Sequence, residues 1–483
     1  MKSSFCRLLK LLLAACLLGG SSTPDAAAQA PRKLLVVTVT VGFRHSSISV
    51  AEDVLAKLGK ESGAFTVDYV RSTPRPTFKD DKEKEKVEQA KWMEALKKDL
   101  AESMSLEALD KYDGVIFANT SGDLPLPDKE GFLNWLKGGK AFIGMHSASD
   151  TFHGFPDFIA LLGGEFRTHH AQVEVEALNQ DLKHPATRHF GPLYKVFDEI
   201  YLLRNFARTN VHGLLWLDKH PNFGIPGDYP VAWCRTYEKS RVFYTSLGHR
   251  EKVWDDPLYQ QHILGGIKWA LGLEQGDAHP QPMFYKLGDA EKKEGFMPLF
   301  NGVDLWGWQL RRGDGRPSWS VQNGMLVNTV TDTTKLVNGA PQRVHGTDLV
   351  TGEMFRDFTI RYEYMIPKGS NSGLYLRGRH EIQITDDFAG GTPQPGGNGA
   401  IYNLAAPARF ASRKPGEWNQ VEATMRGNRV TVILNGEKIH DNVEVTRPTG
   451  GELDGNVTAP GPIMLQGDHG DIAFRNLRLK MLR

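Results

Sequence analysis

The spacing of apolar residues changes once along the chain, at the Gly- and Pro-containing stretch from Gly276 to Gly288. Before this stretch, continuous apolar runs alternate with segments of helical spacing. After it, short segments alternate residue by residue and are separated by turn pairs such as Asn323-Gly324 and Asn435-Gly436. The first pattern predicts an α/β domain with a parallel sheet, and the second predicts an antiparallel sandwich. We therefore expect domains at residues 32–274 and 293–483, joined by a linker at 275–292.

The first domain is expected to be a doubly wound sheet covered by helices on both faces. The expected strands lie at 33–41, 65–70, 112–118, 141–145 and 241–247, and the expected helices lie at 46–58, 80–100, 128–137, 153–162 and 257–271. The helix at 80–100 mixes Lys and Glu along its length, so we expect it to lie on the surface in contact with solvent.

Charge is nearly balanced, with 58 Lys and Arg against 57 Asp and Glu. A polyanion-binding surface needs a basic excess, so nucleic acid is not an expected partner. Apart from the start of the chain, apolar segments are interrupted by charges before they reach the roughly 20 residues that span a bilayer. No transmembrane segment is therefore expected.

The first 28 residues read as a secretory signal peptide. Lys2, Arg7 and Lys10 precede a short apolar run at 11–18, and an Ala-rich exit follows at 26–30. This predicts an exported protein, periplasmic or secreted. The run that ends at Cys16 also resembles a lipoprotein cleavage box, so lipid anchoring stays open. After such a cleavage Cys234 is the remaining cysteine, and its strand-like surroundings predict a buried, unreactive thiol.

A sharp turn is expected after the strand at 141–145, in the sequence Gly144-Met145-His146-Ser147-Ala148. Small residues around a polar centre, between a strand and a helix, are typical of a nucleophile elbow. His146 occupies the centre, where an imidazole can act as a base or a metal ligand. Ser147 is a nucleophile only if a base lies within reach.

Further histidines follow expected strands, where functional groups of such folds gather. His45 follows the first strand, His169 and His170 follow a Gly-Gly-Glu-Phe-Arg segment, and His249 follows the strand at 241–247. A single histidine is more often structural, but a group at one sheet edge favours function. Imidazole suits zinc or a similar ion. A divalent metal, held by His45, His169 and His249, is the cofactor that these residues suggest.

Together these motifs resemble the trehalose-utilisation (ThuA-like) family over about residues 32–272. The resemblance rests on Gly-Phe-Arg-His, Gly-Met-His-Ser-Ala, Gly-Gly-Glu-Phe with paired histidines, and Ser-Leu-Gly-His followed by a helix containing Trp-Ala. It implies a fold like that of class I glutamine amidotransferases and a link to disaccharide metabolism. Because His146 stands where those enzymes carry the elbow cysteine, amidotransferase chemistry is not expected.

In the second domain, a polar row is expected on one face of neighbouring strands. Glu381 and Gln383 alternate with Ile382 and Ile384, so the first pair faces one side and the second pair packs into the sandwich. In the preceding segment the same rule places Tyr375, Arg377 and Arg379 opposite Leu374 and Leu376. Such a row is often solvent-exposed surface. Planar hydrogen-bonding groups beside an aromatic ring also suit a sugar, and we expect Glu381 to be an exposed carboxylate in a cleft.

Loops around this row supply the other candidate residues. Asn371 leads into the first strand, a Gly- and Pro-rich loop at 390–399 opens onto Tyr402, and Asp468-His469 precedes the last strand. His469 is the obvious acid–base group with an ordinary pKa near neutrality, and Asp468 is its nearest partner. A two-carboxylate glycosidase would need a second acid opposite Glu381, and Asp386 or Asp387 is the candidate. The expected substrate-binding residues are Gln383, Tyr375, Asn371, Asp386, Asp468 and Tyr402.

The second half of the chain, about residues 294–483, resembles the 3-keto-disaccharide hydrolase family. The motifs are Leu-Phe-Asn-Gly-Val-Asp-Leu at 299–305, Trp-Gly-Trp at 306–308, Asn-Ser-Gly at 371–373, Glu-Ile-Gln-Ile at 381–384, Gly-Glu-Trp-Asn at 416–419, Leu-Asn-Gly at 434–436 and Phe-Arg-Asn at 474–476. The resemblance implies a concanavalin-like (lectin/glucanase) sandwich and action on 3-keto-glucosides, as a hydrolase or as a lyase and hydratase pair. Trp308 and Trp418 are interpreted as core aromatics.

A ketone at carbon 3 of a sugar acidifies the hydrogen on carbon 2. Glu381 is then a base or metal ligand, His469 an acid or base, and Arg377 or a divalent ion stabilises the enolate. We expect an exported carbohydrate-processing enzyme. Two alternatives stay open: the sandwich is a non-catalytic carbohydrate-binding module beside a catalytic first domain, or the protein is structural. The natural glycoside, and the choice between hydrolysis and elimination, stay open as well.

Overall fold

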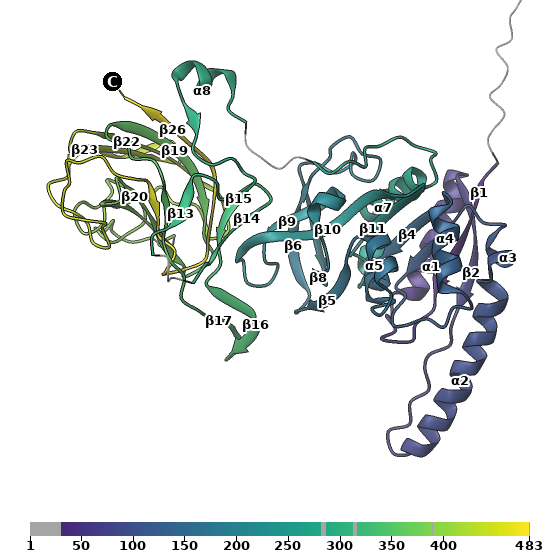
Figure 1. Cartoon of the computed structure of the whole chain (residues 1–483). Helices are drawn as coiled ribbons and strands as arrows, with labels where there is room; N and C mark the ends of the chain where they lie inside the picture. The colour runs from purple at the N-terminus through teal and green to yellow at the C-terminus, as the bar shows by residue number, and fades with distance from the viewer. Residues whose placement is uncertain (1–29, 282–285, 313–315, 389, 483) are drawn as a thin grey trace, which may run out of the picture.

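The fold is described from a computed structural model that covers residues 30–281, 286–312, 316–388 and 390–482. The predicted signal peptide, including Cys16, lies outside these residues. The chain folds into two domains, an α/β domain followed in sequence by a β-sandwich (Figure 1). Among the described helices, none is both long and apolar enough to cross a membrane.

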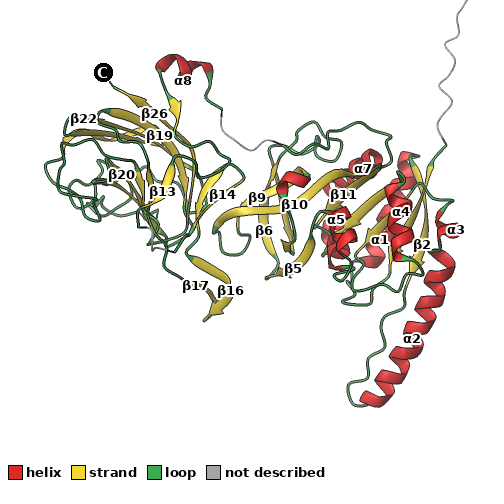
Figure 2. Ribbon diagram, viewed as in Figure 1, coloured by secondary structure: helices red, strands yellow, loops and turns green. Residues whose placement is uncertain are grey.

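The first domain is built on a nine-stranded sheet, counted over the described residues. In spatial order its strands are β2 (Phe65–Arg71), β1 (Arg32–Thr38), β3 (Gly114–Ala118), β4 (Ala141–Met145), β11 (Ser240–Thr245), β10 (Pro226–Tyr237), β9 (His212–Lys219), β6 (Val173–Asn179) and β7 (Leu193–Asp198). The strands from β2 to β11 are parallel, as expected. Figure 2 shows the helices packed around them.

The antiparallel half of this sheet was not predicted. Strands β10 and β11 are joined by Glu238 and Lys239 alone, and a connection of two residues can join only antiparallel neighbours. From β11 to β7 the sheet therefore continues with antiparallel pairing. A separate pair, β5 (Glu165–His169) with β8 (Tyr201–Arg204), completes the strands of this domain.

Helices cover both faces of the sheet, as the buried runs predict. Residues of α1 (Ile48–Ser62), α6 (Glu251–Asp255) and α7 (Pro257–Ala270) share one core cluster, and residues of α2 (Lys82–Ser103), α3 (Leu106–Leu109), α4 (Lys129–Lys137) and α5 (Pro156–Leu162) share the other. Helix α2 buries only Leu96 and Leu100 and projects from the body, which confirms the expected surface helix (Figure 1). The helix expected at 153–162 starts later, at Pro156, because proline favours the first position of a helix. Residues 146–150 form a short 3-10 turn, η1.

The second domain is a two-layer antiparallel sandwich. One layer consists of β14 (Trp319–Gln322), β15 (Met325–Asn328), β26 (Ile472–Met481), β19 (Phe358–Met365), β22 (Asn419–Arg426), β23 (Arg429–Leu434) and β24 (Glu437–Glu444), with β12 (Met297–Pro298) beside β26. The other layer consists of β13 (Trp308–Leu310), β18 (Leu349–Thr351), β25 (Met464–Leu465), β20 (Asn371–Leu376) and β21 (His380–Thr385). A hairpin of β16 (Thr331–Val337) and β17 (Ala340–Arg343) projects from this domain (Figure 1).

The predicted hairpin turns are confirmed. Asn435 and Gly436 join β23 to β24 with positive φ values of 52° and 86°, which a two-residue turn between twisted strands requires. Asn323 and Gly324 do the same between β14 and β15, with φ values of 51° and 73°. Asparagine and glycine adopt this left-handed conformation at low cost, so these pairs set the register of both hairpins.

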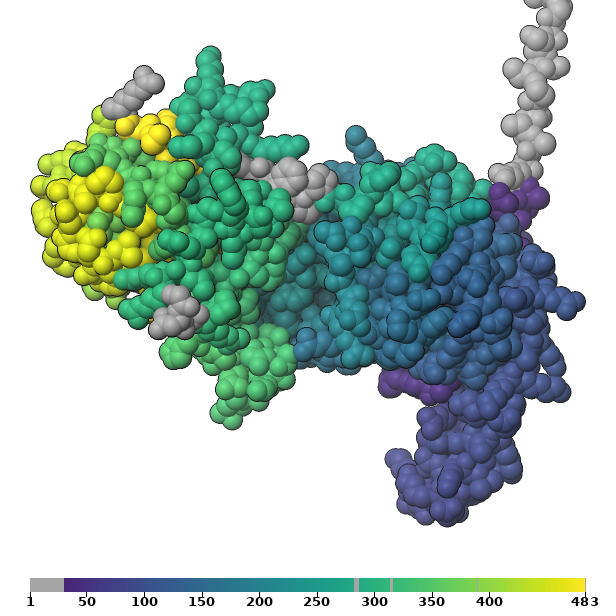
Figure 3. Space-filling model, viewed as in Figure 1, coloured from purple at the N-terminus to yellow at the C-terminus, as the bar shows by residue number. Residues whose placement is uncertain are grey.

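The domains touch in the space-filling view (Figure 3). The indole Nε1 of Trp418 donates a hydrogen bond of 3.0 Å to Asp218, and Lys219 Nζ donates one of 2.8 Å to the Gly416 carbonyl. Trp418 is also covered by the Arg475 guanidinium, 3.9 Å from its ring centre. Its predicted place in the core is therefore corrected to a place at the domain boundary, whereas Trp308 packs in the sandwich core as expected. Helix α8 (Asp289–Glu294) begins inside the predicted linker and packs on the sandwich, where Glu291 pairs with Arg478 of β26.

Candidate functional sites

The turn after β4 presents His146 at the carboxyl edge of the parallel strands. His146 has a positive φ of 48°, a conformation that a non-glycine residue holds only when its surroundings fix it. The small residues of the motif have a steric reason. A Cβ on Gly144 would lie 3.0 Å from Tyr244 and 3.3 Å from the Ala148 Cβ, so a larger residue would force these neighbours to shift. The sharp turn predicted at 144–148 is thus present.

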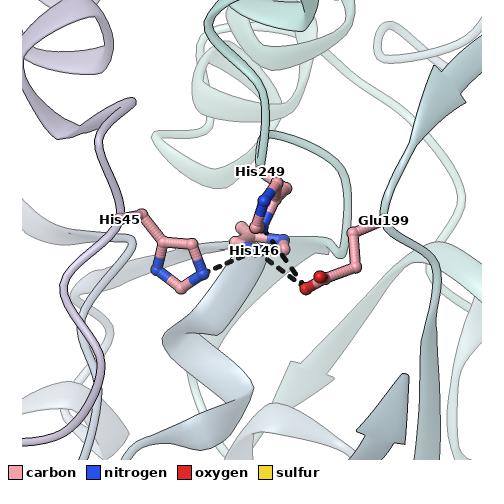
Figure 4. A group of neighbouring side chains, drawn as sticks. All are labelled: His45, His146, Glu199 and His249. Atoms are coloured by element: carbon pink, nitrogen blue, oxygen red, sulfur yellow. Dashed lines mark hydrogen bonds and ion pairs between the residues drawn. The ribbon is translucent and has the colours of Figure 1, made fainter. Parts of the chain in front are cut away.

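Three histidines and one glutamate converge at this turn (Figure 4). They come from separate segments: His45 from the loop after β1, His146 from the turn after β4, Glu199 from the residue after β7, and His249 from the loop after β11. One nitrogen or oxygen of each lies within 4.8 Å of those of the other three, and the group could hold a metal ion. Three of the four side chains are buried and His249 is partly buried.

The contacts inside this group, called here the His–Glu cluster, are specific. His146 Nε2 lies 3.1 Å from His45 Nε2 and 3.0 Å from the Tyr201 hydroxyl. Glu199 Oε1 lies 3.3 Å from His249 Nδ1. Burial lowers the pKa of His45 to about 4 and lowers the pKa of His146 as well, because desolvation penalises the imidazolium form. The hydrogen bond to Glu199 raises the pKa of His249.

The structure changes the predicted set of ligands. His45 and His249 lie in the His–Glu cluster, and His146 joins them. His169 instead contacts the other oxygen of Glu199, at 2.9 Å, and is corrected to a residue that orients the carboxylate. Glu199 was missed, because strand β7 was not predicted. Its signal was an acidic pair, Asp198-Glu199, directly after an alternating segment.

The structure brings a base within reach of Ser147, but it buries the hydroxyl of Ser147 and the thiol of Cys234. Ser147 Oγ lies 3.2 Å from His45 Nδ1, and it is fully buried within the turn. Cys234 is buried on β10 and free of disulfide bonds among the described residues, and burial raises the pKa of its thiol. The expected burial of the thiol is confirmed, and its lack of reactivity stays a prediction that the raised pKa supports.

A second group of polar side chains lies on the outer face of the five-stranded layer. Ile382 and Ile384 pack in the sandwich core, so Glu381 and Gln383 face the other way, as strand periodicity predicts. Tyr375, opposite Glu381 on β20, donates a hydrogen bond of 2.9 Å to Glu381 Oε2. A Cβ on Gly373 would lie 2.1 Å from Glu381 Oε1, so the neighbouring strand must carry glycine where the carboxylate lies against it.

Glu381 is not the exposed carboxylate that was expected, since only 2% of it is accessible. Burial raises the pKa of Glu381 from an ordinary 4.5 to about 7, and the hydrogen bond from Tyr375 opposes part of this shift. The backbone N–H of Tyr402 donates to the Glu381 carbonyl at 3.0 Å and closes the edge of β21.

His469 and Asp468 form a pair beside this carboxylate. His469 Nδ1 and Asp468 Oδ1 are hydrogen-bonded, which raises the pKa of His469 and lowers that of Asp468. His469 is close enough that its charge lowers the pKa of Glu381, and the charge of Glu381 raises the pKa of His469. Gln466, which sequence reasoning missed, completes the group: its Nε2 lies 3.4 Å from the Tyr375 hydroxyl.

Arg377 does not belong to this group. It lies in the turn between β20 and β21 with a φ of 53°, and its guanidinium donates to the carbonyls of Arg356 and Val457 and to Asp357. The expectation that Arg377 stabilises an enolate beside Glu381 is therefore wrong. The alternation that placed it there ends with β20 at Leu376.

The remaining predicted residues surround the group or lie outside it. Gln383 Oε1 accepts from the Ile384 N–H, and its Nε2 lies 3.5 Å from the Gly396 carbonyl, so Gln383 braces the Gly-rich loop. Asp386 accepts from the Gly369 N–H and fixes a turn. Asn371 lies at the opposite end of β20 from Tyr375. These three are placed as supports, and their contact with a substrate stays a prediction.

Comparison with known proteins agrees with this division of the chain. Residues 33–270 match the trehalose utilisation (ThuA) family, and residues 295–480 match the family of 3-keto-alpha-glucoside-1,2-lyase-like domains. The chain thus joins a ThuA domain to a 3-keto-alpha-glucoside-1,2-lyase-like domain.

One curated relative and two solved structures illustrate the similarity. A 3-keto-disaccharide hydrolase of Bacteroides thetaiotaomicron is 25% identical over 236 residues, which cover 39% of this chain and 79% of that protein. A candidate glycosyl hydrolase from Parabacteroides distasonis is 26% identical, with a TM-score of 0.33, over 41% of this chain and 99% of its own. A candidate ThuA-like protein from Parabacteroides merdae is 19% identical, with a TM-score of 0.40, over 53% of this chain and 93% of its own.

Proposed function

We propose that the second domain cleaves 3-keto-glucosides at the group formed by Glu381, Tyr375, His469 and Asp468. The observation that carries the proposal is the buried carboxylate of Glu381, whose pKa of about 7 suits a general base at neutral pH. The name of the curated relative supports this choice of substrate class. A carboxylate whose proton affinity is raised by burial, and whose pKa responds to the charge of a nearby histidine, is typical of catalytic sites.

The proposed reaction begins with removal of the hydrogen on carbon 2 by the ionised Glu381. The carbon–hydrogen electron pair forms an enolate with the ketone at carbon 3, and the bond from carbon 1 to its leaving group then breaks. His469 gives its proton to the leaving oxygen, since Asp468 favours the protonated imidazole. Addition of water to the resulting unsaturated ketone returns a proton to carbon 2 and gives net hydrolysis. The chain is a hydrolase if it also performs this addition, and a lyase if it does not.

Tyr375 orients the base in this scheme. Burial and Glu381 both raise the pKa of its phenol, so Tyr375 stays protonated and donates to the carboxylate. The donated hydrogen bond occupies Oε2, which leaves Oε1 to take the proton. Gln466 Nε2 donates to the same phenol at 3.4 Å and helps to hold Tyr375 in place.

The test uses the full chain, a 3-keto-glucoside and D₂O. Removal and return of the carbon 2 hydrogen predicts one deuterium at carbon 2 of the released sugar, seen by NMR. Direct displacement at carbon 1 would leave carbon 2 without deuterium, and this result would exclude the elimination. The Glu381→Gln variant should lose turnover, and Glu199→Gln should keep it. The reverse pattern would show that the sandwich only binds carbohydrate and that the first domain carries the chemistry.

We also propose that the protein is exported. Support comes from the three cations, the short apolar run and the Ala-rich segment within residues 1–30. The mature protein would then begin near Gln29. N-terminal mass spectrometry of the expressed protein tests this, and a lipid-modified Cys16 would show anchoring instead of release.

A further inference from the structure

We propose that the His–Glu cluster binds one divalent transition-metal ion of the zinc class, held by His45, His146, His249 and Glu199. This inference goes beyond the activity proposed for the second domain and depends on none of its residues. The four side chains point toward a common centre from four separate segments (Figure 4). Buried polar groups that converge in this way need a partner that satisfies all of them, and a cation does so.

The distances suit such an ion. Ligands bound at about 2.0–2.2 Å in a tetrahedral or octahedral site lie roughly 3–3.5 Å from one another. The distance between His45 Nε2 and His146 Nε2 is 3.1 Å, and that between His249 Nδ1 and Glu199 Oε1 is 3.3 Å. The distance between His146 Nε2 and Glu199 Oε1 is longer, at 3.9 Å. The His45–His146 pair and the His249–Glu199 pair would therefore have to move slightly closer to each other to bind one ion.

The hydrogen bonds around the cluster direct lone pairs toward its centre. The Ser246 carbonyl accepts from His146 Nδ1 at 2.7 Å, so the proton of this neutral imidazole is on Nδ1 and Nε2 presents a lone pair. His169 contacts Glu199 Oε2 at 2.9 Å, which leaves Oε1 toward the centre. Outer contacts of this kind orient histidine and carboxylate ligands in metal sites.

The loop that carries His249 is fixed in the same way. Asp198 is fully buried, and its carboxylate accepts from the N–H groups of Gly248, at 2.7 Å, and Arg250, at 3.3 Å. These two residues flank His249, so the imidazole is held where it meets Glu199. A site that is already assembled in this way loses little conformational entropy when an ion binds.

The donor set selects the class of ion. Imidazole nitrogens suit zinc, nickel, copper and iron, whereas magnesium and calcium take oxygen ligands. Three imidazoles with one carboxylate provide four ligands, and a five- or six-coordinate ion keeps further positions for water or a sugar oxygen. About a fifth of the His249 side chain and nearly half of that of His169 are accessible, which gives the ion a way in.

The experiment measures metal content and does not depend on turnover. The full chain, free of affinity tag, is stripped with a chelator and titrated with Zn²⁺, Co²⁺, Mg²⁺ or Ca²⁺ in separate calorimetric runs. We expect about one equivalent of Zn²⁺ or Co²⁺ per chain and no uptake of Mg²⁺ or Ca²⁺. Bound Co²⁺ should give visible absorption bands that Zn²⁺ displaces. Saturation with Mg²⁺, or no uptake of Zn²⁺, would overturn the proposal.

Two variants assign the ion to the cluster, and a third is the matched control. Glu199→Gln keeps the shape of the side chain, and His249→Ala removes the least buried ligand, so both should fold, as circular dichroism checks. Each should weaken Zn²⁺ binding by at least about 10–100-fold. His189→Ala removes a histidine whose Nε2 contacts the Leu258 carbonyl outside the cluster, and it should bind as the wild type does. Unchanged binding in Glu199→Gln and His249→Ala would place the ion elsewhere and overturn the assignment. Glu381→Gln should also bind one equivalent, which separates this test from that of the proposed function.

Discussion

The Tyr375 hydroxyl donates a hydrogen bond of 2.9 Å to Glu381 Oε2 across neighbouring antiparallel strands. The two side chains stand opposite each other in the register of β20 and β21, so the strand pairing itself holds the contact. It lies on the face that the sandwich core does not use, beside the Asp468–His469 pair. The pairing of β20 with β21 therefore fixes Glu381, the base of the proposed reaction, and the loop before β26 carries His469, its acid.

Glu381→Gln should reduce turnover of a 3-keto-glucoside by about 10²–10⁴-fold, because it removes an acid–base group but keeps the shape of the side chain. Steady-state kinetics on the full chain measures this loss. Glu437→Gln is the matched control, because Glu437 is exposed, lies in the layer that does not contain Glu381 and forms an ion pair with Arg409. Equal activity of Glu381→Gln and wild type would contradict the assignment.

Glu381→Gln should leave the free energy of unfolding unchanged at acidic pH and change it at higher pH. Because the pKa of Glu381 is about 7 in the folded protein and 4.5 ordinarily, the folded state binds more protons between these values. Folding stability then falls as pH rises through this window, by about 3 kcal/mol in total for this group. Glu381→Gln should match the wild type at pH below about 4.5 and be more stable at pH above about 7. Denaturant unfolding at both pH values checks this, and a variant less stable than wild type at the higher pH would contradict it.

The pH profile of kcat/KM should be bell-shaped. Activity rises as Glu381 ionises, with a midpoint near its pKa of about 7, and falls at higher pH as His469 loses the proton that Asp468 stabilises. Asp468→Asn removes that stabilising charge and should shift the alkaline limb to lower pH; the acidic limb should move less in the same direction, because the Asp468 charge is a smaller cause of the raised pKa of Glu381. An alkaline limb that stays in place would mean that His469 is not the acid.

Ile382→Ala should destabilise the protein by about 2–5 kcal/mol, because Ile382 is buried in the sandwich core. Ile433→Ala is the control with the same chemical change, at a partly exposed position on β23. Chemical denaturation should show a clearly smaller loss for Ile433→Ala. Equal losses would mean that the assignment of faces on β21 is incorrect.

The first domain should show no glutaminase activity and form no covalent adduct with a glutamine analogue. The turn after β4 carries His146, and the thiol of Cys234 is buried on β10. Intact-mass measurement after incubation with the analogue should show an unchanged mass under native conditions. Alkylation of Cys234 by iodoacetamide after denaturation is the positive control, and adduct formation in the native protein would contradict the prediction.

Much of the fold follows from local sequence, for reasons of periodicity. The parallel strands, the surface helix at 82–103 and the hairpins at Asn323-Gly324 and Asn435-Gly436 each depend on residues close together in the chain. The antiparallel half of the first sheet was not predicted, because β6, β7 and β9 were not recognised as strands, although β7 has an alternating burial pattern.

For the sites, the sequence determined which residue types stand where chemistry is possible. It placed His146 at a sharp turn, and it placed Glu381 opposite the core-facing Ile382, since strand periodicity is a local property. Only the tertiary structure decided that Glu199 joins His45, His146 and His249, because the four come from segments whose pairing no local pattern encodes. It also decided that Glu381 is buried, because the accessibility of a side chain depends on how the segments around it pack, and this burial raises its pKa.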